Sequence, residues 1–156
     1  MAKKTIIVFS GDLDKAMAAF VIANGAAAMG DEVTMFFTFW GLNILRRPEK
    51  VPTKKSFLQG MFGLMMPRGP GRLGLSKMNF GGLGARMMKL VMRQQNVSSL
   101  DDLFASAREQ GVKMVACTMS MDVMGLGRDE LVDGLEYAGV ASYLAEADEA
   151  NVNLFI

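Results

Sequence analysis

The sequence predicts an α/β fold with a doubly wound parallel sheet, and three observations carry this prediction. Residues Thr5 to Phe9 are a continuous apolar, largely β-branched run, which is typical of a strand buried on both faces. A stretch with helical apolar spacing follows, and a second apolar run covers Glu32 to Thr38. Strand, helix and strand of these lengths form a βαβ unit, so the two strands should be parallel with a right-handed crossover.

The first helix has clear predicted ends. Ser10, Gly11 and Asp12 supply a turn after the first strand. Asp12 or Asp14 suits the helix N-terminus, where free N–H groups and the helix dipole favour an anion. Apolar residues at i, i+3, i+4 and i+7 continue to about Met29, and the glycine that follows is the expected C′ residue.

The alternation of helices and strands resumes after residue 93. The predicted elements are a helix capped by Ser98 or Ser99 and ending at Glu109, a strand Val112–Cys117, a one-turn helix capped by Ser120, a short helix Arg128–Val132, a strand Leu135–Val140, a helix Ser142–Ala150 and a strand Val152–Ile156. Five strands of this kind predict one domain over residues 1–156 with the sheet order 2-1-3-4-5. That order places the loop after strand 1 opposite Cys117, at the edge where ligands usually bind.

Composition narrows the class of protein. Of the 156 residues, 51% are hydrophobic and 21% are charged, which is typical of a globular chain. No apolar run reaches the roughly 18 residues of a spanning helix, and the polar Ser10–Lys15 segment interrupts the apolar N-terminus where a secretory leader must be continuous. We therefore expect a soluble, cytoplasmic protein.

The chain contains no histidine and a single cysteine, Cys117. This composition excludes Ser-His-Asp triads, Cys–His pairs within one chain, histidine-ligated metal sites, cysteine zinc sites and internal disulfides. We expect no metal site and no cofactor. Any thiol chemistry must use Cys117 and an external partner.

Residues 46–93 form a basic insert after the second strand. The insert holds eleven Lys and Arg residues against one acid, Glu49, so its formal charge is +10, and the rest of the chain is −9 because the total is +1. All four prolines lie in it. We expect a short helix Lys55–Met65, an irregular loop Pro67–Gly74 and an amphipathic helix Leu83–Gln94.

Three interpretations of the insert stay open. In the first interpretation the insert makes contacts between subunits. In the second it binds an acidic partner or an anionic membrane surface through the Leu83–Gln94 helix. In the third it binds nucleic acid. The number of basic residues suits nucleic acid, but no RNA or DNA motif accompanies them. Subunit or partner contacts are the favoured interpretation.

Cys117 is the candidate catalytic residue, and it has two interpretations. It ends a strand just before the predicted Ser120 helix, whose N–H groups would stabilise a thiolate. Alternatively, a lone cysteine on an apolar strand is a small buried hydrophobe. The same choice applies to Ser10, Gly11 and Asp12, which either line the cleft beside the thiol or serve only as turn and cap.

Aromatic and sulfur-containing side chains flank the predicted site. Phe39 and Trp40 follow the second strand, and they either wall the site or an oligomer interface, or pack in the core. Met119, Met121 and Met124 suggest a soft metal such as copper, but methionine in a chain this rich in it more often fills gaps in the core.

Four segments resemble a known family. They are SGDLDKA at 10–16, ANGAAAMG at 23–30, TMFFTFWGL at 34–42 and ACTMSMDVMG at 116–125. Together they are similar to the DsrE/DsrF/DsrH-like sulfur-carrier proteins, specifically the DsrE-like branch that is sometimes labelled "peroxiredoxin family". The resemblance covers essentially the whole chain, including the insert.

The resemblance implies a flavodoxin-like fold, a homo-oligomer such as a trimer or hexamer, and Cys117 as the residue that carries sulfane sulfur as a persulfide. It also implies sulfur donors and acceptors as partners, either proteins or small sulfane-sulfur compounds. Peroxide chemistry fits less well, because the chain has no resolving cysteine. The alternative function is a non-catalytic oligomeric module that docks an acidic partner or a membrane surface through its insert.

Overall fold

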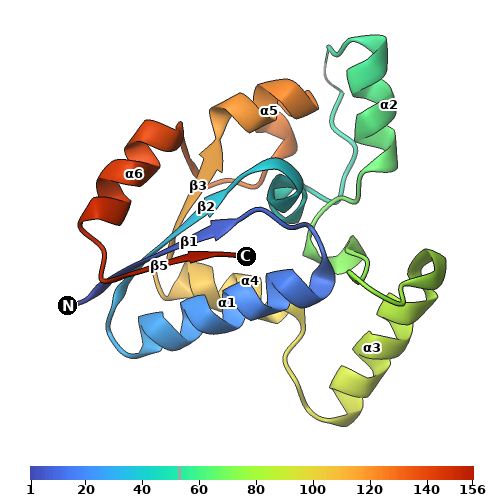
Figure 1. Ribbon diagram of the computed structural model, residues 1–156. Helices are drawn as coiled ribbons and strands as arrows, with labels where there is room; N and C mark the ends of the chain where they lie inside the picture. Colours follow the sequence, from blue (N-terminus) through green and yellow to red (C-terminus); the bar gives the residue numbers. More distant parts are fainter. Residues whose placement is uncertain (53) are drawn as a thin grey trace.

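Apolar β-branched and aromatic segments form the strands of a parallel sheet in the computed structural model, which describes residues 1–52 and 54–156 (Figure 1). Position 53 falls within the predicted insert and lies outside the described residues. The elements in chain order are β1 (Lys3–Val8), α1 (Leu13–Ala28), β2 (Glu32–Phe37), η1 (Phe39–Leu45), α2 (Phe57–Met65), η2 (Pro70–Arg72), η3 (Phe80–Gly82), α3 (Leu83–Gln94), α4 (Leu100–Glu109), β3 (Lys113–Cys117), α5 (Thr118–Met124), η4 (Arg128–Glu130), β4 (Glu136–Ala138), α6 (Val140–Asp148) and β5 (Val152–Phe155).

The sheet has five parallel strands in the order β4-β3-β2-β1-β5. The α/β class and the five-stranded parallel sheet are therefore confirmed, but the predicted order 2-1-3-4-5 is wrong. β2, not β1, lies next to β3, and β5 pairs with the other edge of β1.

The burial of β2 explains this order. Five of its six residues are buried, whereas β1 leaves half of its residues partly exposed. This burial matches the place of β2 at the centre of the sheet, where other strands and helices cover it on every side. The chain then steps in one direction from β1 to β4, and only the crossover through α6 reverses to place β5 beside β1.

Successive right-handed crossovers in one direction put their helices on one face, and the reversed crossover puts its helix on the other. α1 and α4 accordingly pack side by side below the sheet in Figure 1, and α6 lies above it. The larger core lies on the α1/α4 face. A smaller cluster lies on the α6 face, and it consists of Phe36, Val115, Cys117 and Tyr143 with Ile7, Ala138 and Ala147 packed around it.

Most predicted boundaries hold to within two residues. The helix Leu83–Gln94 is observed as predicted, and Ser99 caps α4 by accepting a hydrogen bond from the Asp102 N–H at 3.1 Å. The helix predicted from Lys55 begins at Phe57, because Ser56 and Gln59 form a capping box there. The last helix begins at Val140 rather than Ser142.

Polar contacts hold α6 against the sheet. The Thr34 hydroxyl donates to the Glu146 carboxylate at 2.7 Å, and the Lys113 ammonium forms an ion pair with the same carboxylate. Burial raises the pKa of Glu146, but the hydrogen bonds from Lys113 and Thr34 outweigh burial, so the pKa lies below its usual value. Ionised Glu146 therefore stabilises the packing of α6.

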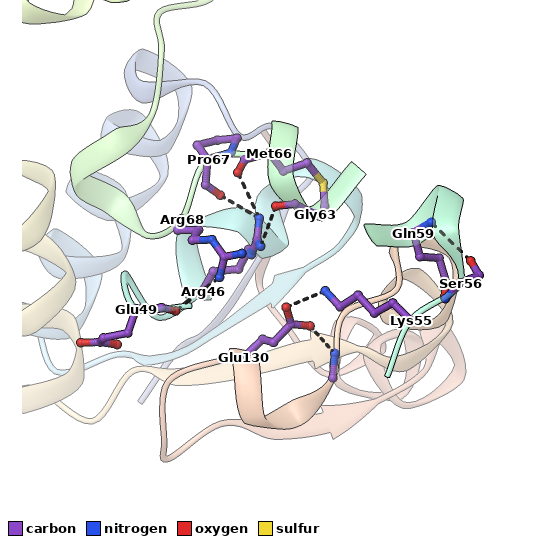
Figure 2. A network of polar contacts seen from close by, with 11 residues as sticks. Arg46, Glu49, Lys55, Ser56, Gln59, Gly63, Met66, Pro67, Arg68 and Glu130 are labelled. Atoms are coloured by element: carbon purple, nitrogen blue, oxygen red, sulfur yellow. Dashed lines mark hydrogen bonds and ion pairs between the residues drawn. The ribbon is translucent and has the colours of Figure 1, made fainter. Parts of the chain in front are cut away.

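Arg46, the first residue of the insert, joins α2 to the segment that directly follows η1 (Figure 2). Its side chain is fully buried, and its guanidinium donates to the carbonyl oxygens of Gly63 at 3.1 Å and of Met66 and Pro67 at 3.2 Å. These carbonyls lie at and just beyond the C-terminus of α2, where they lack helical partners and where a cation is favoured. Burial lowers the pKa of Arg46.

A second contact in Figure 2 holds the segment just before α2. The Lys55 ammonium pairs with the buried Glu130 carboxylate at 2.6 Å, and the other Glu130 oxygen accepts from the Gly127 N–H at 2.9 Å. α2 is thus anchored at both ends. No helix among the described residues is long and apolar enough to cross a membrane.

Substitution of Arg46 should loosen α2 selectively. In Arg46→Leu, the buried carbonyls of Gly63 and Met66 and the partly buried carbonyl of Pro67 lose their donor, at a cost of about 1–3 kcal/mol for each buried one left unpaired. Hydrogen exchange of the amides in residues 57–66 should become faster than in the parent, while exchange in β1–β3 changes little. Arg47→Leu is the matched control, because Arg47 pairs with the exposed Asp133 and should change stability by less than about 1 kcal/mol. Equal exchange of α2 amides in both variants would contradict the role of Arg46.

Glu146 should make stability depend on pH. A depressed folded-state pKa gives stability that is present above the unfolded-state value and is lost as pH falls through the folded-state value. Glu146→Gln should therefore lower the free energy of unfolding by about 1 kcal/mol at neutral pH. The difference from the parent should shrink as pH falls from about 5 to about 2. Urea unfolding of the parent and of Glu146→Gln across these pH values measures the difference. Glu109→Gln, on the exposed end of α4, is the control.

Candidate functional site

Cys117 is the last residue of β3 and lies at the carboxyl edge of the sheet. Side chains alternate between the faces of a strand, so Val115 and Cys117 both point toward α6. The cysteine packs there with Phe36 and Tyr143 and is 3% exposed. Its thiol therefore lies beneath the surface, next to the start of α5.

A chain of hydroxyl groups leads to the thiol. The Ser120 hydroxyl donates to the Cys117 sulfur at 3.5 Å, and it lies 2.7 Å from the Thr38 hydroxyl. Because Ser120 uses its proton on the sulfur, Thr38 supplies the donor for the second bond. Ser120 is fully buried, so these two bonds replace the hydrogen bonds that water would otherwise make.

The role of Ser120 differs from the prediction, in which it caps the helix. Cys117 is itself the N-cap of α5, and Thr118 is the first helical residue. The extended backbone of β3 continues to Cys117, and the helix begins at the next residue. Ser120, although serine is a preferred residue at helix caps, is therefore the third residue of the helix. The Cys117 side chain makes no capping hydrogen bond to the α5 backbone, and Ser120 reaches it through its hydroxyl instead.

Thr38 was not identified from the sequence as a site residue. It follows β2 directly, and β2 is the neighbour of β3 in the observed order. The parallel strand ends bring Thr38 to the same edge as Cys117. A correct strand order was the one signal that would have identified it.

The loop Ser10–Asp12 follows β1, which is separated from β3 by β2. The Ser10 hydroxyl accepts from the Asp12 N–H at 3.1 Å and donates to the Asp12 carboxylate at 3.2 Å. This loop lines a cavity of about 210 Å³ together with Trp40, Asn43, Pro67 and Gly74. The predicted residues Ser10, Gly11, Asp12 and Trp40 thus come together, but around a cavity that Cys117 does not line.

Close backbone packing shapes this cavity. A Cβ atom at Gly11 would lie 2.6 Å from the Trp40 carbonyl oxygen, so only glycine fits. Asn43 is 2% exposed, and its side-chain oxygen has no hydrogen-bond partner among the described residues. Asn43 is the second polar residue of this edge that the sequence did not single out.

The remaining predicted residues lie elsewhere. The Phe39 ring packs against Phe9, with 5.7 Å between ring centroids. Met119 is exposed on α5, whereas Met121 and Met124 are buried in the larger core. The three methionines therefore do not face one another, and the described residues contain no cluster of three or more acidic or cysteine side chains suited to a metal ion.

The insert packs against α5, the helix that begins directly after Cys117. The Gln59 side-chain amide in α2 donates to the Asp122 carbonyl of α5 at 3.2 Å. Gly125 follows the end of α5, and a Cβ atom at this position would lie 2.6 Å from the Gln59 Cβ, so the two helices approach closely here. α5 is thereby in contact with both β3 and α2.

Residues 1–155 match the DsrE/DsrF/DrsH-like family. The chain belongs to this family. The protein is 38% identical over 158 residues to the Sulfur carrier protein DsrE2 of Allochromatium vinosum, a match that covers 99% of this chain and 98% of that protein. It is also 61% identical over 154 residues to the Uncharacterized protein YrkE of Bacillus subtilis, covering 99% and 96% of the two chains.

Two solved structures share the fold of this DsrE-like chain. The ychN protein from E. coli matches with a TM-score of 0.58 and 12% identity over the whole of both chains. The protein MTH1491 from Methanobacterium thermoautotrophicum, whose function is given as unknown, matches with a TM-score of 0.55 and 12% identity over 99% of both chains. At this identity the likeness establishes the fold alone.

Removal of the Thr38 hydroxyl should destabilise the protein. Thr38→Val keeps the shape of the side chain but leaves the buried Ser120 hydroxyl without one partner, so the free energy of unfolding should fall by about 1–3 kcal/mol. Urea unfolding measures the loss. Thr118→Val is the control, since the Thr118 hydroxyl makes no hydrogen bond to the described residues and its loss should matter little. Unchanged stability of Thr38→Val would refute the hydroxyl chain.

Proposed function

We propose that this protein is a sulfur carrier that holds sulfane sulfur as a persulfide on Cys117. The observation that carries the proposal is the position of the chain's only cysteine, at the carboxyl edge of β3 and within hydrogen-bond reach of Ser120, in a chain of the DsrE/DsrF/DrsH-like family. The 38% identity to a protein named as a sulfur carrier supports the same chemistry.

The transfer needs one thiol and no cofactor. The Cys117 thiolate attacks the outer sulfur of a donor persulfide, a new S–S bond forms to Cys117, and the S–S bond of the donor breaks. The donor leaves as a thiolate, so the reaction requires neither an oxidant nor a reductant. An acceptor thiolate then attacks the outer sulfur, and Cys117 is released as a thiolate.

The hydroxyl chain suits both halves of this cycle. The Ser120 O–H points at the Cys117 sulfur, the atom that carries negative charge before loading and again after release. A hydrogen bond to a charged acceptor is stronger than one to a neutral acceptor. The Thr38 hydroxyl keeps the Ser120 proton directed at the sulfur by occupying the other side of the Ser120 oxygen.

The burial of Cys117 sets a condition on its partners. With the residue 3% exposed, a donor reaches the sulfur only when α5 or α6 moves aside. α5 spans seven residues and α6 nine, and short surface elements open at lower free energy than central strands do. The partners are either sulfur-donor and sulfur-acceptor proteins that promote this opening or sulfane compounds small enough to enter.

Loading of sulfur onto the purified protein tests the proposal. Incubation with a persulfide donor or thiosulfate should add one sulfur atom to the intact mass, and a thiol reductant should remove it. Cys117→Ser should gain no sulfur under the same conditions. The variant is suitable because it preserves the size of the side chain and leaves no other thiol in the chain.

Access to Cys117 distinguishes a carrier from a structural cysteine. If the mass does not change while the thiol of the folded protein reacts with an alkylating reagent, the sulfur is accessible but does not accept sulfane sulfur, and the proposal fails. An equal gain of mass on Cys117→Ser would also overturn it.

A further inference from the structure

We propose that α2 and α3 dock this protein onto an anionic lipid bilayer, with both helices lying in the plane of the membrane interface. Neither sulfur chemistry nor Cys117 enters this inference. It rests on exposed apolar side chains, on a long segment without acids and on a groove lined by basic side chains, all in the insert or directly after it.

α2 exposes almost all of its apolar surface. The helix contains no charged residue and buries only Gly63. Its large side chains are all exposed, and the least exposed of them, Met61, is 46% exposed; the others are Phe57, Leu58, Phe62, Leu64 and Met65. Contiguous exposed apolar surface of this kind marks a protein or membrane contact site.

α3 is amphipathic and also stands away from the core. Only Ala85 of this helix is buried. Leu83, Met87, Leu90 and Val91 follow the i, i+4, i+7, i+8 spacing of one apolar stripe, and all four are exposed. A basic stripe of Arg86, Lys89 and Arg93 borders it. Long basic side chains beside an apolar stripe reach headgroup phosphates while the stripe enters the acyl region.

The charge of the insert selects an anionic bilayer as the occupant. From Lys50 to Leu100 the sequence has nine basic residues and no Asp or Glu. Interfaces between proteins usually pair charges of both signs. A segment that contributes only basic charges together with exposed Phe, Leu and Met side chains is instead complementary to an anionic lipid surface.

A groove beside α3 has room for a lipid headgroup. It measures about 530 Å³, and its lining includes Arg72, Arg86 and Lys89 with the backbone of Gly81 and Gly82. The Lys89 ammonium already donates to the Gly71 carbonyl at 2.7 Å, which holds it beside the groove. Guanidinium groups bind phosphate oxygens in a bidentate manner, so Arg72 and Arg86 suit a lipid phosphate.

The geometry is that of a helix lying on a membrane rather than crossing it. α2 has nine residues and α3 twelve, which at about 1.5 Å per residue is far less than the roughly 30 Å of a hydrocarbon core. Both helices project on the side of the molecule away from the N-terminus (Figure 1). Arg46 anchors the end of α2 to the sheet domain, so the docked helix stays attached to the rest of the protein.

Flotation with lipid vesicles tests this docking. The full-length protein should float with vesicles that contain phosphatidylglycerol and should remain at the bottom with pure phosphatidylcholine vesicles. Replacing Arg86, Lys89 and Arg93 with Gln should weaken binding about 100-fold. Phe57→Ser combined with Phe62→Ser should weaken it at least about tenfold. Both Phe side chains are exposed, so the fold should survive, and circular dichroism verifies this.

Two matched variants separate the inference from its alternatives. Replacing Lys3, Lys15 and Arg128 with Gln removes the same charge outside the insert and should leave binding unchanged. Cys117→Ser should bind vesicles as the parent does, because docking is independent of sulfur transfer. If both triple variants lose binding equally, only net charge matters and the proposal is overturned.

Self-association provides the last decisive result. Sedimentation of the parent and of the Phe57/Phe62 double variant is measured without lipid. If the parent ignores anionic vesicles and forms an oligomer that the double variant does not form, then a second copy of the chain covers this face, and docking on a membrane is refuted.

Discussion

Parallel pairing of β2 with both β1 and β3 is the constraint on which the geometry of the site depends. Because β2 lies between them, the residue that follows β2, Thr38, meets the residues that follow β3. The loop after β1 is displaced by one strand and forms a separate cavity with Trp40 and Asn43. The thiol of Cys117 is consequently set among hydroxyl groups and apolar side chains, with its polar contact made by Ser120.

The insert contacts the helix that follows Cys117. Arg46 and Lys55 fix the two ends of α2 to the sheet domain, and Gln59 of α2 contacts the α5 backbone. α5 begins directly after Cys117. α2 therefore contacts the helix that follows Cys117, through one hydrogen bond.

A buried sulfur suits a carrier that must hold a reactive group between partners. A persulfide in solution exchanges with any accessible thiol. At the α6 face, Phe36 and Tyr143 pack in one cluster with Cys117, which is 3% exposed. Glu146 contributes to that closure, because it holds α6 to Thr34 of β2 and Lys113 of β3. The sheet and α6 thus bury the sulfur from one face.

Local sequence patterns were sufficient to predict most helices and strands, the α/β class and the position of Cys117 at the end of a strand. Apolar runs predicted the strands, helical spacing and a final glycine predicted α1, and the i, i+3, i+4 pattern predicted α3 with its observed bounds. These features depend on neighbours within a few residues, and so the sequence alone determines them. Family membership was also readable from four short segments and is confirmed over residues 1–155.

The tertiary structure decided which strand ends meet. Strand order depends on how much apolar surface each strand buries against all the others, and no local pattern contains that comparison. For this reason Ser10–Asp12 was expected beside Cys117, whereas Thr38 lies there, and Ser120 contacts the sulfur from inside α5 rather than as its cap. The exposure of α2 and α3 was likewise decided in three dimensions, since an apolar segment such as Phe57–Met65 looks the same in sequence whether a core covers it or leaves it bare.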